Sequence, residues 1–186
     1  MSPDKVVLLI IDKAENKCLR GRTLLQKRAY FLAKLTSQDF GFRAHYYGPY
    51  SAMIEDGLSK MKALGFIREE VVDFPSGDQM DFETRRYDYK LTEAGAKIVE
   101  YFSAQSATEV KKISDALDKL ATAGDIGDYL RLSIAAKTHH ILSAKNQVMT
   151  VNDINSEANK LGWKITATQI SEAANFLQKL ELAQKS

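Results

Sequence analysis

Apolar side chains recur with helical spacing in the first 40 residues of the chain. Residues 6–11 form an apolar run after Ser2 and Pro3, two residue types that favour a helix start because serine can accept a backbone N–H and proline loses no hydrogen bond there. A second apolar stripe follows Thr23-Leu24-Leu25-Gln26, a T-x-x-Q pattern typical of a helix capping box. We therefore expect two helices, the second beginning near Leu24 and ending near residues 39–41. Its predicted outward positions are Gln26, Lys27 and Lys34.

The next segment has the pattern of the second half of a winged helix. Gly48-Pro49 predicts a turn, and Ser51 can cap a third helix that ends at Gly65, a residue that suits a left-handed helix end. Residues 66–74 and 84–91 predict two antiparallel strands joined by a polar loop, and Thr92 can cap the helix that follows. This order of helix, strand, loop and strand predicts an exposed wing.

The second half of the chain predicts helices without strands. Helical patterns around residues 110–120 and 129–144 are separated by glycines, and we expect Leu130 to face the interior. Thr150 and a second T-x-x-Q pattern, which begins at Thr166, each start a further helix. The tail therefore predicts a helix-turn-helix unit without a wing. Trp163 lies in its turn, where we expect it to anchor the packing of the two helices.

The small polar residues at 103–108 mark a candidate domain boundary. The expected fold class is mainly α with a small antiparallel β-wing. It comprises a winged helix-turn-helix domain over residues 1–105 and a C-terminal helical domain over residues 106–186, which contains the second helix-turn-helix-like unit.

Composition limits the class of protein. The chain has 186 residues, of which 45% are hydrophobic, enough for one or two modest cores. No apolar run approaches the roughly 18 to 20 residues that cross a bilayer, so we expect a soluble cytoplasmic protein with no membrane partner. The single cysteine, Cys18, excludes an internal disulfide framework and is interpreted as a plain reduced thiol in a loop.

Charge is informative only in its distribution. The net charge is +2, yet the segment from Lys13 to Arg43 has eight basic residues against two acidic ones. In the second half, Lys160 and Lys164 flank the turn of the second unit, and Arg131, Lys137 and Lys145 precede it. The predicted wing instead has carboxylates where a DNA-binding wing approaches phosphate. They are Glu69, Glu70, Asp73, Asp78, Asp81 and Glu83.

No pattern in the sequence favours catalysis, a metal or a cofactor. His139 and His140 are neighbours and would point about 100° apart on a helix, so they are poorly placed to share one ion. The chain has no G-x-S-x-G, P-loop or G-x-G-x-x-G motif. We therefore expect a protein that is not an enzyme, with no catalytic residues, no metal site and no cofactor.

Four short motifs resemble those of the YwgA-type winged-helix proteins. They are RTLLQK at 22–27, YFL at 30–32, YGPYS at 47–51 and LTEAG at 91–95. The LQK and GPYS motifs are also similar, more distantly, to the Panacea domain of SocA-like antitoxins. The resemblance covers residues 5–102 and implies a winged helix. In antitoxin relatives the domain binds or neutralises a protein, so the resemblance also implies an interaction role.

Two functions remain open at this point. The leading hypothesis is a DNA-binding transcriptional regulator that acts as a homodimer and contacts double-stranded DNA through both units. The expected phosphate contacts are Arg20, Arg22, Lys27 and Arg28. The residues expected to approach bases are Ser59, Lys60 and Lys62 in the first unit and Thr168, Gln169 and Asn175 in the second.

The alternative is a protein-interaction module of adaptor or antitoxin type. It would use the third helix and the acidic wing, because carboxylates suit a basic partner surface better than a phosphate backbone. The residues expected at that interface are Tyr50, Glu55, Asp56, Glu69 and Glu70.

Overall fold

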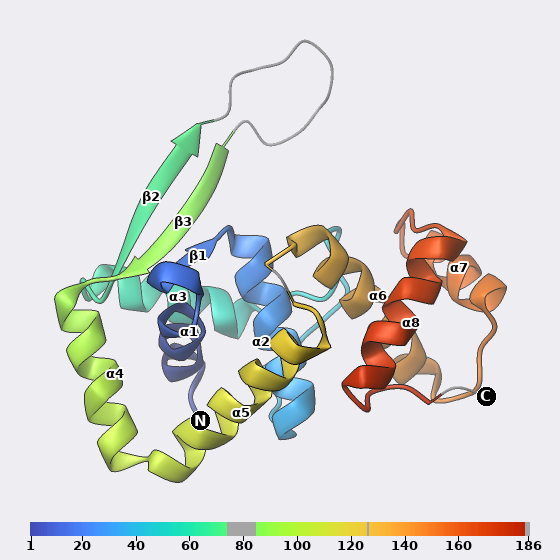
Figure 1. Cartoon of the computed structure of the whole chain (residues 1–186). Coiled ribbons are helices and arrows are strands. Elements are labelled where there is room, and N and C mark those ends of the chain that lie inside the picture. Colours follow the sequence, from blue (N-terminus) through green and yellow to red (C-terminus); the bar gives the residue numbers. More distant parts are fainter. Residues whose placement is uncertain (74–84, 126, 185–186) are drawn as a thin grey trace.

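The computed structural model describes residues 1–73, 85–125 and 127–184 (Figure 1). The first half contains helices α1 (Pro3–Asp12), α2 (Arg22–Thr36) and α3 (Ala52–Ala63), the short 3-10 helix η1 (Glu15–Lys17) and strands β1 (Cys18–Arg20), β2 (Ile67–Asp73) and β3 (Arg85–Leu91). The second half contains α4 (Glu93–Gln105), α5 (Ala107–Ala123), α6 (Tyr129–Lys145), α7 (Val151–Lys160) and α8 (Ala167–Lys179). The mainly helical fold class with a small antiparallel sheet is confirmed.

The three strands form one antiparallel sheet in the order β1-β3-β2. Tyr89 on β3 lies between Leu19 on β1 and Glu69 on β2, and the β2–β3 hairpin extends away from the helices (Figure 1). The element order α1-β1-α2-α3-β2-β3 is that of a complete winged helix. The prediction that Cys18 lies in a loop is wrong, because Cys18 is the first residue of β1. The sequence pattern missed this strand because its three residues are too few to show alternation.

Most of the predicted helix starts are confirmed by their capping bonds. The Ser51 hydroxyl accepts the N–H of Ile54, and the Thr92 hydroxyl accepts the N–H of Gly95. Thr150 and Thr166 both form complete capping boxes with the third helical residue. These caps depend on residues three positions apart, so they follow directly from the local sequence.

The capping box predicted at residues 23–26 is wrong. Helix α2 begins at Arg22, with Gly21 at the cap position and no side-chain cap. The Gln26 side chain is buried and bonds instead to the backbone of Ser51, 25 residues along the chain. A tertiary contact therefore replaced a local one.

Helix α1 forms the centre of the core. Its side chains from Val6 to Ile11 are all buried, and the helix packs against α2, α3, α4, α5 and β3 (Figure 1). Helix α5 also packs on α2, and α2 packs on α6, so buried side chains form one continuous cluster through both halves. The division at residues 105 and 106 coincides with the joint between α4 and α5 at Ser106, and two separate domains stay a prediction.

Two side chains of the second half show where periodicity succeeds and fails. Trp163 is buried, as expected for the turn between α7 and α8. Leu130 is 55% exposed in the first turn of α6, so its predicted inward position is wrong. No helix within the described ranges is long and apolar enough to span a membrane.

Candidate nucleic-acid interface

Lys27 is not on the surface of α2. Its side chain is only 2% exposed, and its Nζ donates a hydrogen bond of 2.8 Å to the carbonyl of Pro49. The predicted outward positions of Gln26 and Lys27 are therefore wrong, and Lys27 does not present an amine to a phosphate. Helical spacing alone missed this because the 48–51 turn covers a face of α2 that the local pattern leaves polar.

The LQK and GPYS motifs contact each other directly. Gln26 Nε2 donates to the Ser51 carbonyl at 3.0 Å, and Gln26 Oε1 accepts the Ser51 N–H at 2.9 Å. Gly48 has φ of +97° and packs so closely on the two lysines beneath it that an added Cβ would lie 3.1 Å from Lys137 Cγ. We call residues 45–51, together with these contacts, the clamped turn. The motif pair thus has a structural role in joining α2 to the connection before α3.

The LTEAG motif also has a structural role. A Cβ at Gly95 would collide with the carbonyl oxygen of Phe66, because the first turn of α4 lies directly against the backbone before β2. Thr92 strengthens this junction, since its hydroxyl donates to the Gly65 carbonyl at 2.7 Å. These three motifs of the family resemblance, LQK, GPYS and LTEAG, therefore describe the fold and do not describe a ligand.

The remaining basic residues predicted to hold phosphates have different surroundings. Arg28 Nε donates to Asp125 Oδ2 at 2.8 Å in a mostly buried ion pair. Arg22 lies 3.6 Å from Glu55 and over the ring of Tyr87. The structure thus places Arg28 and Arg22 in intramolecular contacts and leaves Arg20 exposed at the end of β1.

Helix α3 has its basic residues paired with neighbouring elements. Lys60 Nζ lies 2.6 Å from Asp4 of α1, and Lys62 Nζ lies 2.6 Å from Glu69 of β2. Ser59 is exposed, and so is Asp56 three positions before it on the helix. The three residues expected to approach bases therefore share one helix, but both lysines already have carboxylate partners.

The described part of the wing is not acidic. Glu70 lies within 2.7 Å of Lys90 and 2.8 Å of Arg68, and Asp73 pairs with Arg85 at 3.0 Å. The expected carboxylates at 78, 81 and 83 lie outside the described residues. Tyr50 is partly buried, with its backbone bonded to Arg43 and its ring 5.2 Å from that of His45. Burial raises the pKa of its phenol.

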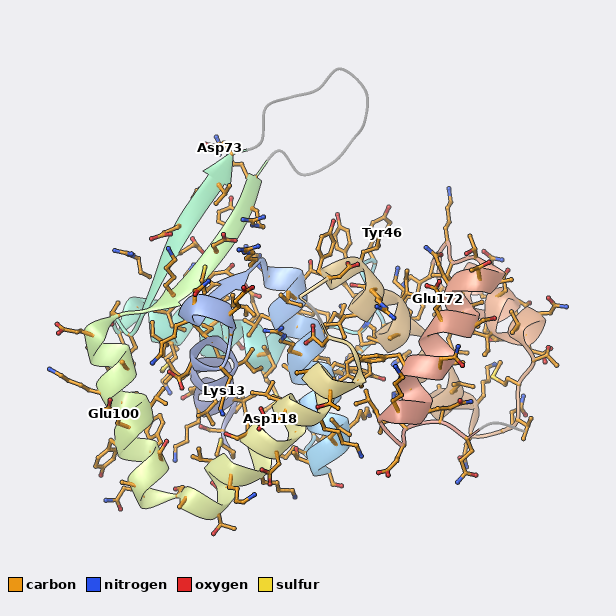
Figure 2. All side chains as sticks on the ribbon, in the orientation of Figure 1. Lys13, Tyr46, Asp73, Glu100, Asp118 and Glu172 are labelled. Carbon is orange, nitrogen blue, oxygen red and sulfur yellow. The ribbon has the colours of Figure 1, made fainter. Side chains whose placement is uncertain are left out.

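Helix α8 differs from α3 in the freedom of its outer face. Thr168, Ser171, Glu172, Asn175 and Lys179 are exposed at positions that form one stripe, as their spacing of three and four residues requires. Figure 2 labels Glu172 on α8. Within the described residues neither of the two charged members, Glu172 and Lys179, has an ion-pair partner. We call this set the α8 stripe.

Gln169, which was expected to read bases, is outside the α8 stripe. Its side chain accepts the N–H of Thr166 at 2.9 Å in the capping box. Thr168 and Asn175 remain exposed and were identified by the sequence. Lys179 was not among the expected binding residues, although its helical spacing relative to Thr168 was available as a signal.

Exposed basic side chains surround the α8 stripe. Arg131 of α6 lines a small pocket with Gln169, Glu172 and Phe176, so it lies beside the helix. Lys164 precedes the N-cap of α8, and Lys179 ends the stripe. None of the three has an ion-pair partner in the part of the chain that the structure describes. Together with the stripe they form a polar surface with excess positive charge.

The buried ionisable groups lie between the two units. Burial, reinforced by Lys137, lowers the pKa of Lys27 to about 7. Burial also lowers the pKa of His139 to about 4, and its Nδ1 lies 2.7 Å from the hydroxyl of Tyr30. Burial therefore favours the neutral amine of Lys27 and the neutral imidazole of His139 more than water does. Neutral buried groups are consistent with a structural role.

Comparisons of the chain with known proteins add nothing to this geometry. No protein-family model matches the chain, and no curated protein matches its sequence. The likeness to YwgA-type proteins therefore stays an expectation from motifs.

Proposed function

We propose that the protein binds duplex DNA through its second helix-turn-helix unit, with the α8 stripe in the major groove. The observation that carries this proposal is the free outer face of α8, which contrasts with the paired charges of α3. A recognition helix requires side chains that are exposed and not already bonded within the protein. Thr168, Glu172, Asn175 and Lys179 meet this requirement within the described residues. The Ser171 hydroxyl donates to the Ala167 carbonyl at 3.0 Å, and α3 meets the requirement less well than the stripe.

The side chains of the α8 stripe suit base edges. Asn175 has both a donor and an acceptor and can pair with adenine, and Thr168 and Ser171 offer hydroxyls. Glu172 can accept from the amino group of cytosine. The major groove of B-DNA is roughly 8.5 Å deep and admits an α-helix. The stripe thus supplies hydrogen-bond donors and acceptors along a helix that can enter this groove.

The basic residues around the stripe supply the affinity. Arg131, Lys164 and Lys179 lie on α6, before α8 and at its end, where flanking phosphates would run beside an inserted helix. Each phosphate contact releases condensed counterions, so binding should weaken steeply with salt. A non-enzymatic role agrees with Cys18, since burial and Asp88 raise the pKa of its thiol and disfavour the reactive thiolate. The reduced thiol also suits the cytoplasm.

The test is a salt series of fluorescence anisotropy with a mixed-sequence duplex. The triple variant R131A/K164A/K179A should reduce the slope of log affinity against log salt by about 2 to 3, since each contact contributes roughly 0.9. Affinity at about 0.1 M salt should fall at least tenfold. The matched control is K13A/K97A/K111A, which removes three exposed positive charges from other elements.

Two outcomes would contradict the proposal. In the first, the wild-type protein shows no duplex binding at about 50 mM salt and micromolar concentration, conditions under which even nonspecific DNA binding is expected. Alternatively, both triple variants would lose affinity equally, which would show a response to net charge alone. Copurification of a stoichiometric protein partner would instead favour the interaction module.

A further inference from the structure

The clamped turn exposes two adjacent aromatic rings. Tyr46 is 72% exposed and Tyr47 is 48% exposed, and their ring centroids lie 4.9 Å apart in a perpendicular arrangement. Figure 2 shows Tyr46 projecting beyond the ribbon near α6. Exposed aromatic surface is costly in water, at about 25 cal/mol per Å². The neighbouring contacts show that this exposure is held in place by the fold.

Buried side chains hold the backbone on both sides of the rings. Trp163 Nε1 donates to the His45 carbonyl at 2.7 Å, and Lys27 Nζ donates to the Pro49 carbonyl at 2.8 Å. Gly48 N–H bonds back to His45 at 2.9 Å within the turn. These bonds come from α2 and from the turn before α8. A partner that contacts the rings would therefore meet a surface ordered in advance, with little further entropy lost on binding.

The surroundings of the rings are basic. Three segments meet at Trp163, namely residues 40–51, 129–146 and 160–166, and none of them contains an acidic residue. Arg43 is exposed and has no ion-pair partner among the residues that the structure describes. Lys137 lies over the ring of Trp163 at 5.6 Å. The nearby carboxylate of Glu157 already pairs with two lysines of these segments.

We propose that the clamped turn is a stacking platform for single-stranded nucleic acid. Aromatic side chains in a positively charged setting are the combination that holds single strands, because every base has a face that can stack and every nucleotide carries a phosphate. Tyr46, the more exposed ring, stacks a base, and Arg43 contacts the adjoining phosphate. The charge argues against a basic protein partner, because the three segments that meet at Trp163 contain no acidic residue and the carboxylate of Glu157 is already paired. This platform is separate from the α8 stripe and does not depend on duplex binding there.

The test uses a labelled oligothymidylate of about 15 nucleotides, near the upper site size of one binding module. Replacing Tyr46 by alanine should weaken binding roughly 5- to 100-fold, the range seen for loss of one stacked base. Tyr46→Phe keeps the ring and should remain within about twofold of wild type. Tyr101→Ala removes a tyrosine that is 59% exposed on α4 and should have no effect. Arg43→Ala should weaken binding and flatten the salt dependence.

The same variants on duplex DNA separate this proposal from the preceding one. Tyr46→Ala should leave duplex affinity unchanged, and R131A/K164A/K179A should lower duplex affinity more than single-strand affinity. Thermal unfolding of Tyr46→Ala should match wild type, because the side chain is exposed. The proposal is overturned if wild type does not bind the oligonucleotide at about 50 mM salt and micromolar concentration. It is also overturned if Tyr46→Ala binds as well as wild type or if Tyr101→Ala loses the same affinity.

Discussion

Helices α3 and α8 hold the same position in their units. Each follows another helix after a connection, residues 37–51 before α3 and residues 161–166 before α8, and each begins at a hydroxyl cap, Ser51 or Thr166. Both expose polar side chains along one face. Lys60, Lys62 and Glu55 of α3 nevertheless reach carboxylates or guanidinium groups of α1, β2 and α2. The α8 stripe has no such neighbours in the described ranges.

The difference arises from the elements around each helix. The winged unit surrounds α3 with α1, α2 and a strand, so long side chains find partners of opposite charge. The second unit packs α8 only against α6 and α7 as its principal neighbours. Exposed ion pairs contribute at most about 1 kcal/mol each to stability. The ion pairs of α3 nevertheless reduce the free positive charge that this helix offers a phosphate. Counting the lysines in the sequence does not reveal this effect.

The largest effect is expected from adding one negative charge to each helix face. Asn175→Glu places a carboxylate in the middle of the α8 stripe and should weaken duplex binding about 100-fold, because it repels phosphate and removes a base contact. Ser59→Glu is the matched change on α3 and should alter affinity less than threefold. Anisotropy with the same duplex measures both. Equal losses would show that the two helices contribute alike, and a greater loss in Ser59→Glu would reverse the comparison.

The next effect concerns stability and tests the role of Lys27. Its pKa is about 7 in the folded chain and 10.5 ordinarily, so between these values the unfolded chain binds the extra proton. Wild-type stability should therefore rise as pH increases through this window, and the cost of burying the charge is fully present below pH 7. Lys27→Met lacks this titration. The difference in unfolding free energy between the variant and wild type should change by roughly 2 kcal/mol from pH 6 to pH 9.

Urea unfolding at the two pH values measures this change. Lys13→Met, an exposed control, should give a profile parallel to wild type. A parallel profile for Lys27→Met would mean that Lys27 is solvated and free to contact phosphate, as its sequence position suggested. Duplex affinity of Lys27→Met at pH 8 should stay close to that of wild type.

A smaller effect is expected when the lysines of α3 are released. D4N/E69Q removes the partners of Lys60 and Lys62 without changing side-chain size. Duplex affinity should rise about three- to tenfold, and the salt slope should steepen by up to about 2. The matched variant D115N/E181Q neutralises carboxylates paired on α5 and near the end of the chain. If both double variants gain equally, the gain comes from net charge, and the pairing of α3 is irrelevant.

The smallest effect is expected at Arg20 and Arg22. Arg20→Ala removes an exposed guanidinium and should lower duplex affinity about twofold, while Arg22→Ala removes one that pairs with Glu55 and should change it less. The same anisotropy assay measures both. A loss of duplex affinity above tenfold in either variant would show that the principal DNA contact lies at the start of α2.

Sequence reasoning succeeded where the interacting groups are close in the chain. Ser51, Thr92 and Thr166 bond to residues three positions away, and the helical stripes repeat every three or four positions. It failed where a polar side chain had a distant partner. Gln26 matched a local capping pattern and bonds instead across 25 residues.

The residues of the candidate site also divide into those whose placement local spacing predicts and those whose contacts depend on distant parts of the chain. Thr168 and Asn175 could be placed on the outer face of α8 from helical spacing, because the apolar positions of that helix are regular. The free or paired state of each charge could not be predicted. Lys60 meets Asp4 across 56 residues, and Arg28 meets Asp125 across 97. No local pattern encodes such distances.

Local sequence patterns were sufficient to predict the helices, two of the three strands, the caps of α3, α4, α7 and α8, and the glycine at the left-handed end of α3. The helices, caps and glycine depend on backbone geometry and hydrogen bonds within one turn of the chain, and the strands were recognised from their local residue pattern. The tertiary structure alone decided that Lys27 is buried under the clamped turn, that the lysines of α3 are paired and that the α8 stripe is free. Burial and ion pairing depend on which elements pack together. For this chain, that packing separates the charges that hold the fold together from those left exposed to bind a partner.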